Sequence, residues 1–190
     1  MGDATQQPAA EMPATVPVDT HAPGPRAAAT FLAGLQAGMM AVIVMLGWLG
    51  LSAVWQRHTF WTAPNQMATL LHGAGAIRAG IGPFTPSGIA VFIVLYSLLG
   101  AGFAVAAPRR LTGLGMMLAG VLVAVGWYCL WFRVLCPTVM PLVWLLHSER
   151  PMAFGHVLYG VLLARYPVYL GERPLSNGRG SEGASSEAES

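Results

Sequence analysis

Long apolar runs, separated by polar or glycine-rich stretches, dominate the pattern along this chain. A helix needs roughly 20 apolar residues to cross about 30 Å of hydrocarbon, and four of the runs reach that length. The pattern therefore predicts an all-α fold, an integral membrane bundle of four transmembrane helices, at residues 31–55, 88–107, 111–135 and 151–170.

The two longer connectors are more than simple turns. Asn65 is a suitable N-cap for a short interfacial helix that carries Met67, Leu70 and Leu71 on one side, and a glycine-rich return follows. The apolar segment 137–147 has only 11 residues, a length typical of re-entrant or interfacial segments. A fifth crossing at this segment is the alternative.

The two ends of the chain have a different composition. Residues 1–29 are rich in Pro and Ala and lack a periodic apolar face, and residues 171–190 are rich in Gly, Ser and Glu. Such segments bury too little apolar surface to offset their ordering entropy. The expected organisation is a disordered tail at 1–29, a transmembrane domain at 30–170 and a second disordered tail at 171–190.

The composition agrees with a membrane protein and excludes several other classes. Of the 190 residues, 55% are hydrophobic and 9% are charged, which is far from the balance of a soluble domain. The net charge is only +2, and no basic cluster alternates with aromatics, so nucleic-acid binding is not expected. The two cysteines form no CxxC motif, which argues against thioredoxin-like redox chemistry.

The arginines and tryptophans indicate an orientation. With both termini cytoplasmic, six arginines lie inside and four outside, and the short Arg109-Arg110 turn between two spans is the strongest part of this signal. Five tryptophans then gather near the outer side, where aromatic rings favour the headgroup layer: Trp55, Trp61, Trp127, Trp131 and Trp144. We therefore expect a multi-pass protein of a cell inner (plasma) membrane.

Small residues recur within the spans and predict close helix packing. They include Gly34 with Gly38, Gly100 with Gly102 and Ala104, Gly120 with Ala124, and Gly155 with Gly160. In lipid, helices associate largely through such close approach of their backbones. These faces either pack within the chain or contact a second copy or another membrane subunit, besides the lipid bilayer itself.

Histidine is the best candidate for chemistry, because a polar group at membrane depth is costly. His156 lies in the fourth run with Tyr159 three residues later, and His147 and His72 lie in the two connectors. These four residues are the candidate cofactor-binding set. A hydrogen bond to another span is the simpler interpretation of His156, and a haem, metal or proton-relay role is the alternative. No cofactor, catalytic residue or dedicated metal site is otherwise predicted.

Three stretches carry a resemblance: FLAGLQAGMMAVIVMLGWLG, FWTAPNQMATLLHG and GHVLYGVLLARYP. In these stretches the chain resembles small four-span bacterial inner-membrane proteins of unknown function, including the YagU-like group. The resemblance covers residues 30–170. The resemblance implies a bacterial inner-membrane location and no particular reaction.

The leading hypothesis for function is a non-enzymatic accessory or structural membrane subunit. A membrane redox or metal- or haem-binding protein that uses His156 is one alternative. A passive channel or small-solute carrier is another, although the spans contain almost no charge that would line a water-filled path.

Overall fold

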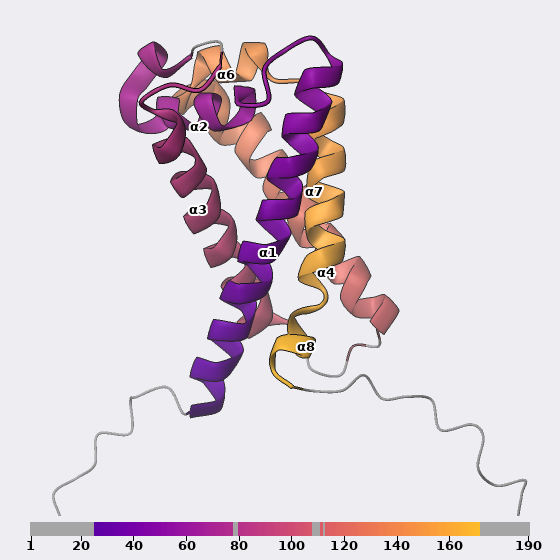
Figure 1. Ribbon diagram of the computed structural model, residues 1–190. Coiled ribbons are helices and arrows are strands. Elements are labelled where there is room, and N and C mark those ends of the chain that lie inside the picture. Colours follow the sequence, from indigo (N-terminus) through magenta and orange to yellow (C-terminus); the bar gives the residue numbers. More distant parts are fainter. Residues whose placement is uncertain (1–24, 78–79, 108–110, 112, 172–190) are drawn as a thin grey trace, which may run out of the picture.

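The computed structural model describes residues 25–77, 80–107, 111 and 113–171, and the regular elements among them are all helical. The all-α prediction is confirmed. Long helices run side by side along one axis, and short helices cover one end, here called the rim (Figure 1). The long helices are α1 (Pro25–Trp55), α3 (Thr85–Ala106), α4 (Gly113–Cys129) and α7 (Glu149–Leu163).

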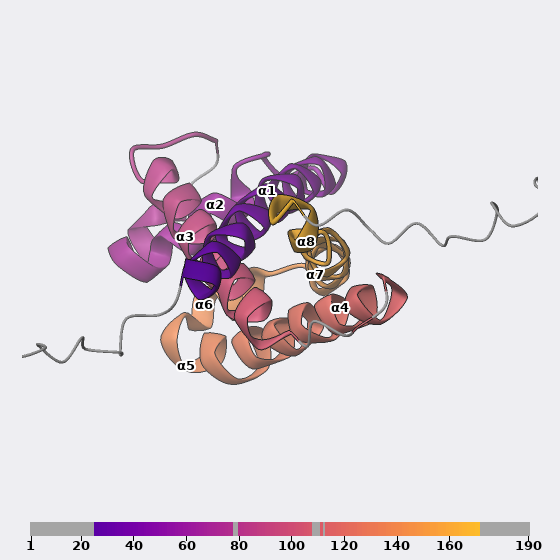
Figure 2. The ribbon, with the colours of Figure 1, turned by 90° about the horizontal axis from the view of Figure 1, so that it is seen from below.

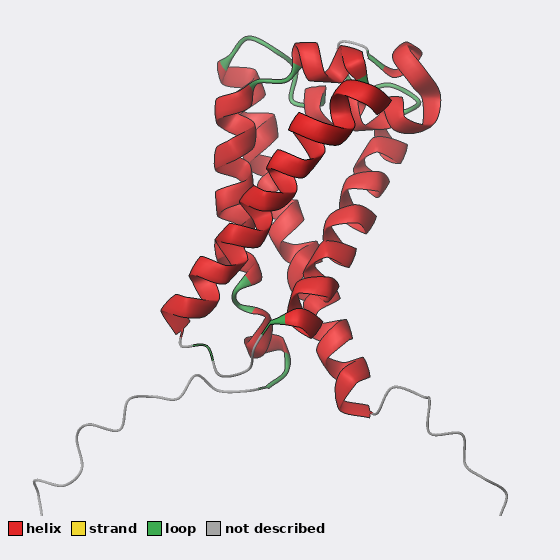
Figure 3. Ribbon diagram, turned by 180° about the vertical axis from the view of Figure 1, so that it is seen from behind, coloured by secondary structure: helices red, strands yellow, loops and turns green. Residues whose placement is uncertain are grey.

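The short elements lie mostly at the rim. They are α2 (Thr62–His72), the 3₁₀ turn η1 (Gly73–Ala76) and α6 (Pro141–Leu146), while α8 (Tyr166–Tyr169) lies at the opposite end. Both ends of the described chain, Pro25 and Gly171, also lie at the end opposite the rim (Figure 3). The expected tails fall almost entirely outside the described residues, except that α1 already begins at Pro25. A proline fits the first helical turn, and alanines follow it.

Three helices are long and apolar enough to cross a membrane: Arg26–Trp55, Thr85–Ala106 and Gly113–Val139. They match the first three predicted spans, so a multi-pass helical membrane protein is supported. The fourth predicted span is shorter than expected, because α7 has 15 residues and ends at Leu163. Pro167 has no N–H to donate to the carbonyl of Leu163, which explains the break before α8.

The third span changes its winding near the rim. After Cys129 the helix continues as the π-helical turn η2 (Leu130–Leu135) and then as α5 (Cys136–Val139). Pro137 would crowd the carbonyl four residues earlier, at Arg133, and a wider turn accommodates it. Met140 then leaves the helical region, with φ −139° and ψ 66°, because Pro141 follows it.

Segment 137–147 is therefore a rim segment. Its helix α6 has six residues and rises only about 9 Å, too little to cross a bilayer. The interfacial interpretation agrees with this placement, and the alternative of a fifth crossing is disfavoured (Figure 1).

One local expectation is wrong. Asn65 does not cap α2, which begins at Thr62 with Trp61 before it. Asn65 is instead buried inside the helix, where its Nδ2 donates to the Gly80 carbonyl and its Oδ1 accepts from Thr85 Oγ1, at 2.9 and 2.6 Å. Its polar side chain thus ties α2 to the connector that leads into α3.

The predicted small-residue faces pack mainly within the chain. A methyl group added to Gly100 would lie 2.6 Å from the Gly34 carbonyl oxygen, and one added to Gly160 would lie 2.6 Å from the Gly120 carbonyl oxygen. The first contact joins α3 to α1 and the second joins α7 to α4, so only glycine allows these backbones to come so close. Gly102, by contrast, faces open space.

The outer face of α4 remains uncovered in the single chain. Leu114, Leu118 and Leu122 are 64%, 59% and 74% exposed and follow one another at four-residue intervals. An apolar stripe of this kind on a candidate span is suited to lipid. Figure 2 shows α4 at the edge of the bundle, beside α7.

Candidate functional site

A hydrogen-bonded cluster occupies the centre of the bundle. His156 on α7 is fully buried, and its Nε2 lies 2.7 Å from the hydroxyl of Tyr96 on α3. Its Nδ1 lies 2.8 Å from the carbonyl oxygen of Met152, one helical turn earlier. Because a carbonyl can only accept, Nδ1 carries the proton, and Nε2 accepts from the Tyr96 hydroxyl.

Tyr159 completes this cluster. Its hydroxyl donates to the carbonyl oxygen of Tyr96 at 2.6 Å, and its ring meets the Tyr96 ring edge to face. The hydrogen bonds at the cluster thus end on two backbone carbonyls, those of Met152 and Tyr96. Both nitrogens of His156 are engaged, so binding a metal or haem iron would require breaking one of its two hydrogen bonds.

Aromatic rings from α4 and its continuation surround the same histidine. The ring centroids of Tyr128 and Phe132 lie 5.1 and 6.3 Å from that of His156. Phe132 also stacks on His147, with centroids 4.7 Å apart. His147 and His156 are therefore separated by one phenyl ring, and His147 directs its Nδ1 to the Trp144 carbonyl instead.

His72 lies away from the other two histidines. It stacks on Phe84 with centroids 4.3 Å apart, and its Nε2 lies 3.0 Å from Ser87 Oγ. The structure thus brings His156 and Tyr159 together, places His147 beyond Phe132, and leaves His72 on the α2–α3 side. Among the described residues no group of three or more His, Cys, Asp or Glu side chains could hold a metal ion.

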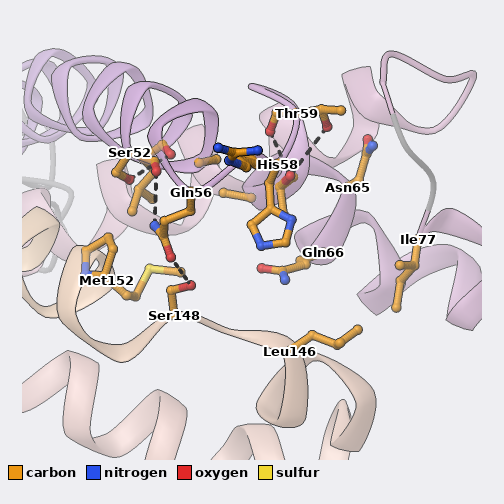
Figure 4. A pocket seen from close by; sticks show the side chains of 16 residues that line it. Ser52, Gln56, His58, Thr59, Asn65, Gln66, Ile77, Leu146, Ser148 and Met152 are labelled. Carbon is orange, nitrogen blue, oxygen red and sulfur yellow. Dashed lines mark hydrogen bonds between the residues drawn. The ribbon is translucent and has the colours of Figure 1, made fainter.

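A pocket of about 390 Å³ opens at the rim, above this cluster (Figure 4). It lies between the end of α1, the first turns of α2 and the start of α7, and its lining combines apolar and polar side chains. We call it the rim pocket; its lining residues are Leu49, Ser52, Ala53, Gln56, Arg57, His58, Thr59, Thr62, Ala63, Asn65, Gln66, Ile77, Leu146, Ser148, Pro151 and Met152.

Hydrogen bonds between helices hold the walls of the rim pocket in place. Ser148 Oγ donates to Gln56 Oε1 at 2.8 Å, which joins the start of α7 to the end of α1. Trp48 Nε1 donates to the Pro151 carbonyl at 3.0 Å and makes a second link between the same helices. Met152 belongs to the pocket lining and its carbonyl accepts from His156, so the pocket lies one helical turn above the buried cluster.

Arg57 terminates α1 in an unusual conformation. Its φ is +62°, and it is the only non-glycine residue with positive φ in the part of the chain that the structure describes. The His58 N–H donates to the Ala53 carbonyl and the Arg57 N–H to the Val54 carbonyl, the two bonds of a Schellman motif. Glycine usually occupies this position, and a side chain there costs about 1 kcal/mol. The backbone is thus strained at the mouth of the pocket.

Three polar side chains of the rim pocket make no side-chain hydrogen bond within the described residues: Arg57, His58 and Gln66. Gln66 is only 8% exposed, so its amide is nearly buried and yet faces the pocket. In Figure 4 the His58 ring and the Gln66 amide both project into the space between α1 and α7. Arg57 and His58 are exposed to solvent and Gln66 is nearly buried, so all three can form hydrogen bonds to a molecule that enters the pocket.

Charge in this region is unbalanced. Glu149 is the one acidic side chain among residues 25–77, 80–107, 111 and 113–171, and it lies 3.8 Å from Arg133. The lining of the rim pocket contains Arg57 and no carboxylate. The charged side chain among the described lining residues is therefore a cation.

Sequence reasoning selected His156 and Tyr159 but missed Tyr96, Arg57, His58 and Gln66. Tyr96 could have been found as the one tyrosine of the second span. Gln66 gave no comparable signal, because it becomes a pocket residue only through the packing of α2 against α1 and α7.

Comparison of the chain with protein-family models, with curated proteins and with solved structures finds no match. The similarity to the YagU-like group, and the bacterial location that it implies, therefore stay predictions.

Proposed function

We propose that this chain is a four-span membrane protein that binds a small polar ligand in its rim pocket, on the membrane face opposite the two chain ends, and performs no covalent chemistry on it. The observation that carries the proposal is the set of three polar side chains without a protein partner in a pocket of about 390 Å³. Ligand sites typically occupy 300–1,000 Å³ and combine an apolar floor with a few polar groups.

The fourth crossing is part of the proposal. The segment from α7 through α8 covers Glu149–Tyr169, and α7 packs along both α1 and α4. The helix α7 alone rises about 22 Å, and the turn and α8 that follow it lengthen the segment toward the roughly 30 Å of hydrocarbon. An even number of crossings also agrees with Pro25 and Gly171 lying at the same end of the bundle (Figure 1).

The geometry favours some of the functional hypotheses made from the sequence and disfavours others. The closed hydrogen bonds of His156 disfavour a metal or haem role, and the fully buried side chains of the cluster beneath the pocket disfavour a passive channel. An accessory role is compatible with ligand binding. Contact with a second copy or another subunit stays a prediction, because the small-residue faces are largely used within the chain.

Ligand binding is tested by asking what copurifies with the protein. Wild-type chain and an Ala53→Phe variant, in which the new ring fills the rim pocket, are purified in mild detergent, and their bound small molecules are extracted and identified by mass spectrometry. Ala106→Phe, on the exposed surface at the other end of α3, is the matched control. Helical circular dichroism verifies the fold of each protein.

A molecule that is retained by the wild type and by Ala106→Phe but lost from Ala53→Phe supports the proposal. If Ala53→Phe does not fold, Gln66→Leu, which keeps the side-chain size and removes the amide, replaces it. Identical extracts from all folded variants would contradict ligand binding in this pocket.

A further inference from the structure

We infer that the ligand of the rim pocket carries a phosphate group, which Arg57, His58 and Gln66 bind together. The inference rests on the proposed binding function and names the chemical class of its ligand. A phosphate of this kind can belong to a lipid headgroup or to a free phosphorylated molecule.

Arg57 gives the lining of the rim pocket a positive charge. Arg57 supplies a guanidinium group with five N–H donors, and the pocket lining contains no carboxylate to neutralise it. Arg57 is exposed, so water and salt screen part of its charge, but no carboxylate of the lining competes with an incoming anion. The pocket therefore favours an anion over a neutral or cationic ligand.

The three side chains offer hydrogen-bond donors that suit phosphate oxygens. The planar fork of a guanidinium matches the oxygen pairs of phosphate, and the amide N–H₂ of Gln66 adds two more donors from the nearly buried wall. His58 projects into the same space and can donate from either ring nitrogen, according to its tautomer (Figure 4). A phosphate group carries oxygen acceptors on several sides, so it can accept hydrogen bonds from all three residues.

Arg57 has a strained backbone conformation. A charged residue in the left-handed region weakens a helix end where glycine would be favoured. Such local strain is typically found at binding and catalytic sites, where the side chain has a task that outweighs its conformational cost. The strain thus makes Arg57 the central residue of the phosphate site.

The rim pocket lies at the end of a candidate membrane span. Trp55, two residues before Arg57, is 87% exposed at the end of a candidate span, and the exposed Phe60 follows shortly after. Aromatic side chains of this kind lie at the headgroup layer of a bilayer, which is also where lipid phosphates lie. A phospholipid headgroup could therefore reach the pocket directly.

The test measures phosphate binding in two arms on the full chain. In the first arm the protein is placed in phosphatidylcholine nanodiscs and titrated with glycerol 3-phosphate by calorimetry, with glycerol as the neutral probe. In the second arm native mass spectrometry counts phosphatidylglycerol molecules retained from nanodiscs made of equal parts phosphatidylglycerol and phosphatidylcholine. The first arm reports a free ligand and the second a lipid.

Arg57→Gly is the most informative variant. It removes the charge but relieves the backbone, so we expect binding to weaken at least about tenfold while the melting temperature stays the same or rises. A merely structural role of Arg57 would lower both. Arg150→Gln, an exposed arginine outside the pocket lining, is the matched control and should bind like the wild type.

The outcomes separate this inference from the proposed function. Binding of a phosphate probe in either arm, lost in Arg57→Gly and kept in Arg150→Gln, supports both. If the wild type retains a neutral molecule that Ala53→Phe loses, and neither arm shows phosphate binding, the phosphate site is refuted. The proposed binding function then still stands. Phosphate binding that Arg57→Gly leaves unchanged overturns the inference as well. No bound molecule of any kind contradicts both.

Discussion

At the scale of single residues, the side chains of His156, Tyr96 and Tyr159 at the bundle centre all form hydrogen bonds, whereas Ser97 Oγ nearby on α3 is buried without a partner among the described residues. His156 donates to one backbone carbonyl and accepts from Tyr96, so a histidine and a tyrosine lie between helices without an open hydrogen-bonding group. Unpaired polar groups at this depth would cost far more than the pair contributes, since the apolar surroundings offer no water. The pair therefore links α3 to α7 by a buried hydrogen bond.

Replacing Tyr96 by Phe tests this pair. The variant leaves Nε2 of His156 buried without its donor, and we expect a loss of about 1–3 kcal/mol in the free energy of unfolding. Denaturant unfolding in detergent, followed by circular dichroism, measures the loss. Tyr169→Phe, at an exposed tyrosine of α8, is the control and should have little effect. Equal stability of Tyr96→Phe and wild type would show that the hydrogen bond does not stabilise the bundle.

The sequence identified one member of this pair but not the other. His156 is conspicuous as a basic side chain within an apolar run, and its burial agrees with the simpler interpretation made from the sequence. Its partner is 60 positions away on another helix. A pattern along one chain does not encode which faces of two helices meet, so the partner had to come from the structure.

A second residue-scale prediction concerns Asn65. Its amide bonds to Gly80 and Thr85 hold the connector into α3 against α2. We expect Asn65→Ala to lower the free energy of unfolding by about 1–3 kcal/mol, because it leaves a buried hydroxyl and a carbonyl without their partner. The exposed Gln36→Ala of α1 is the comparison for the loss of an amide. Indistinguishable melting of the two variants would refute this role of Asn65.

At the scale of helices, the glycines separate internal packing from surface. Gly100 and Gly102 lie two residues apart on α3, yet only Gly100 contacts α1 closely, while Gly102 faces open space. The sequence predicts that both are packing residues, because a small residue permits another backbone to come close. It does not show which neighbouring helix, if any, each residue faces. The helix rotation that decides the matter is set by all the contacts of α3 together.

This pair gives a matched test of helix packing. Gly100→Ala places a methyl group against the backbone of α1, and we expect about 1–3 kcal/mol of destabilisation from overpacking. Gly102→Ala meets no atom and should be neutral or slightly stabilising, since alanine favours a helix. Thermal unfolding of both variants in the same detergent measures the difference. Two equal effects, or the reverse order, would contradict the α1–α3 contact.

The helix boundaries could be predicted from the sequence where composition determines them. They could not be predicted where prolines and packing determine them. The three candidate spans lie close to the apolar runs, because length and hydropathy alone determine whether a segment can cross lipid. The π-helical turn before Pro137 and the early end of α7 before Pro167 were not anticipated. Their causes are local, but a proline within a run can be accommodated in several ways.

At the scale of the whole molecule, the bundle has two unlike ends. One end carries the short helices, exposed aromatics and the rim pocket, and the other carries both ends of the described chain (Figures 1 and 3). Pro25 and Gly171 lie at the same end, and the assignment of that end to the cytoplasmic side, made from the arginines, stays a prediction. The rim pocket would then face the other side of the membrane, and its ligand would come from that side or from that leaflet.

The central claim is that α7 crosses the membrane and so places the rim on the opposite face from both chain ends. Single cysteines at Ala27, Arg150 and Tyr169, in a chain carrying Cys129→Ser and Cys136→Ala, are labelled with a membrane-impermeant maleimide from one side of sealed cells. We predict that the cysteines at positions 27 and 169 react alike and that the one at 150 reacts from the opposite side. Reaction of positions 150 and 169 from the same side would contradict the four-span bundle.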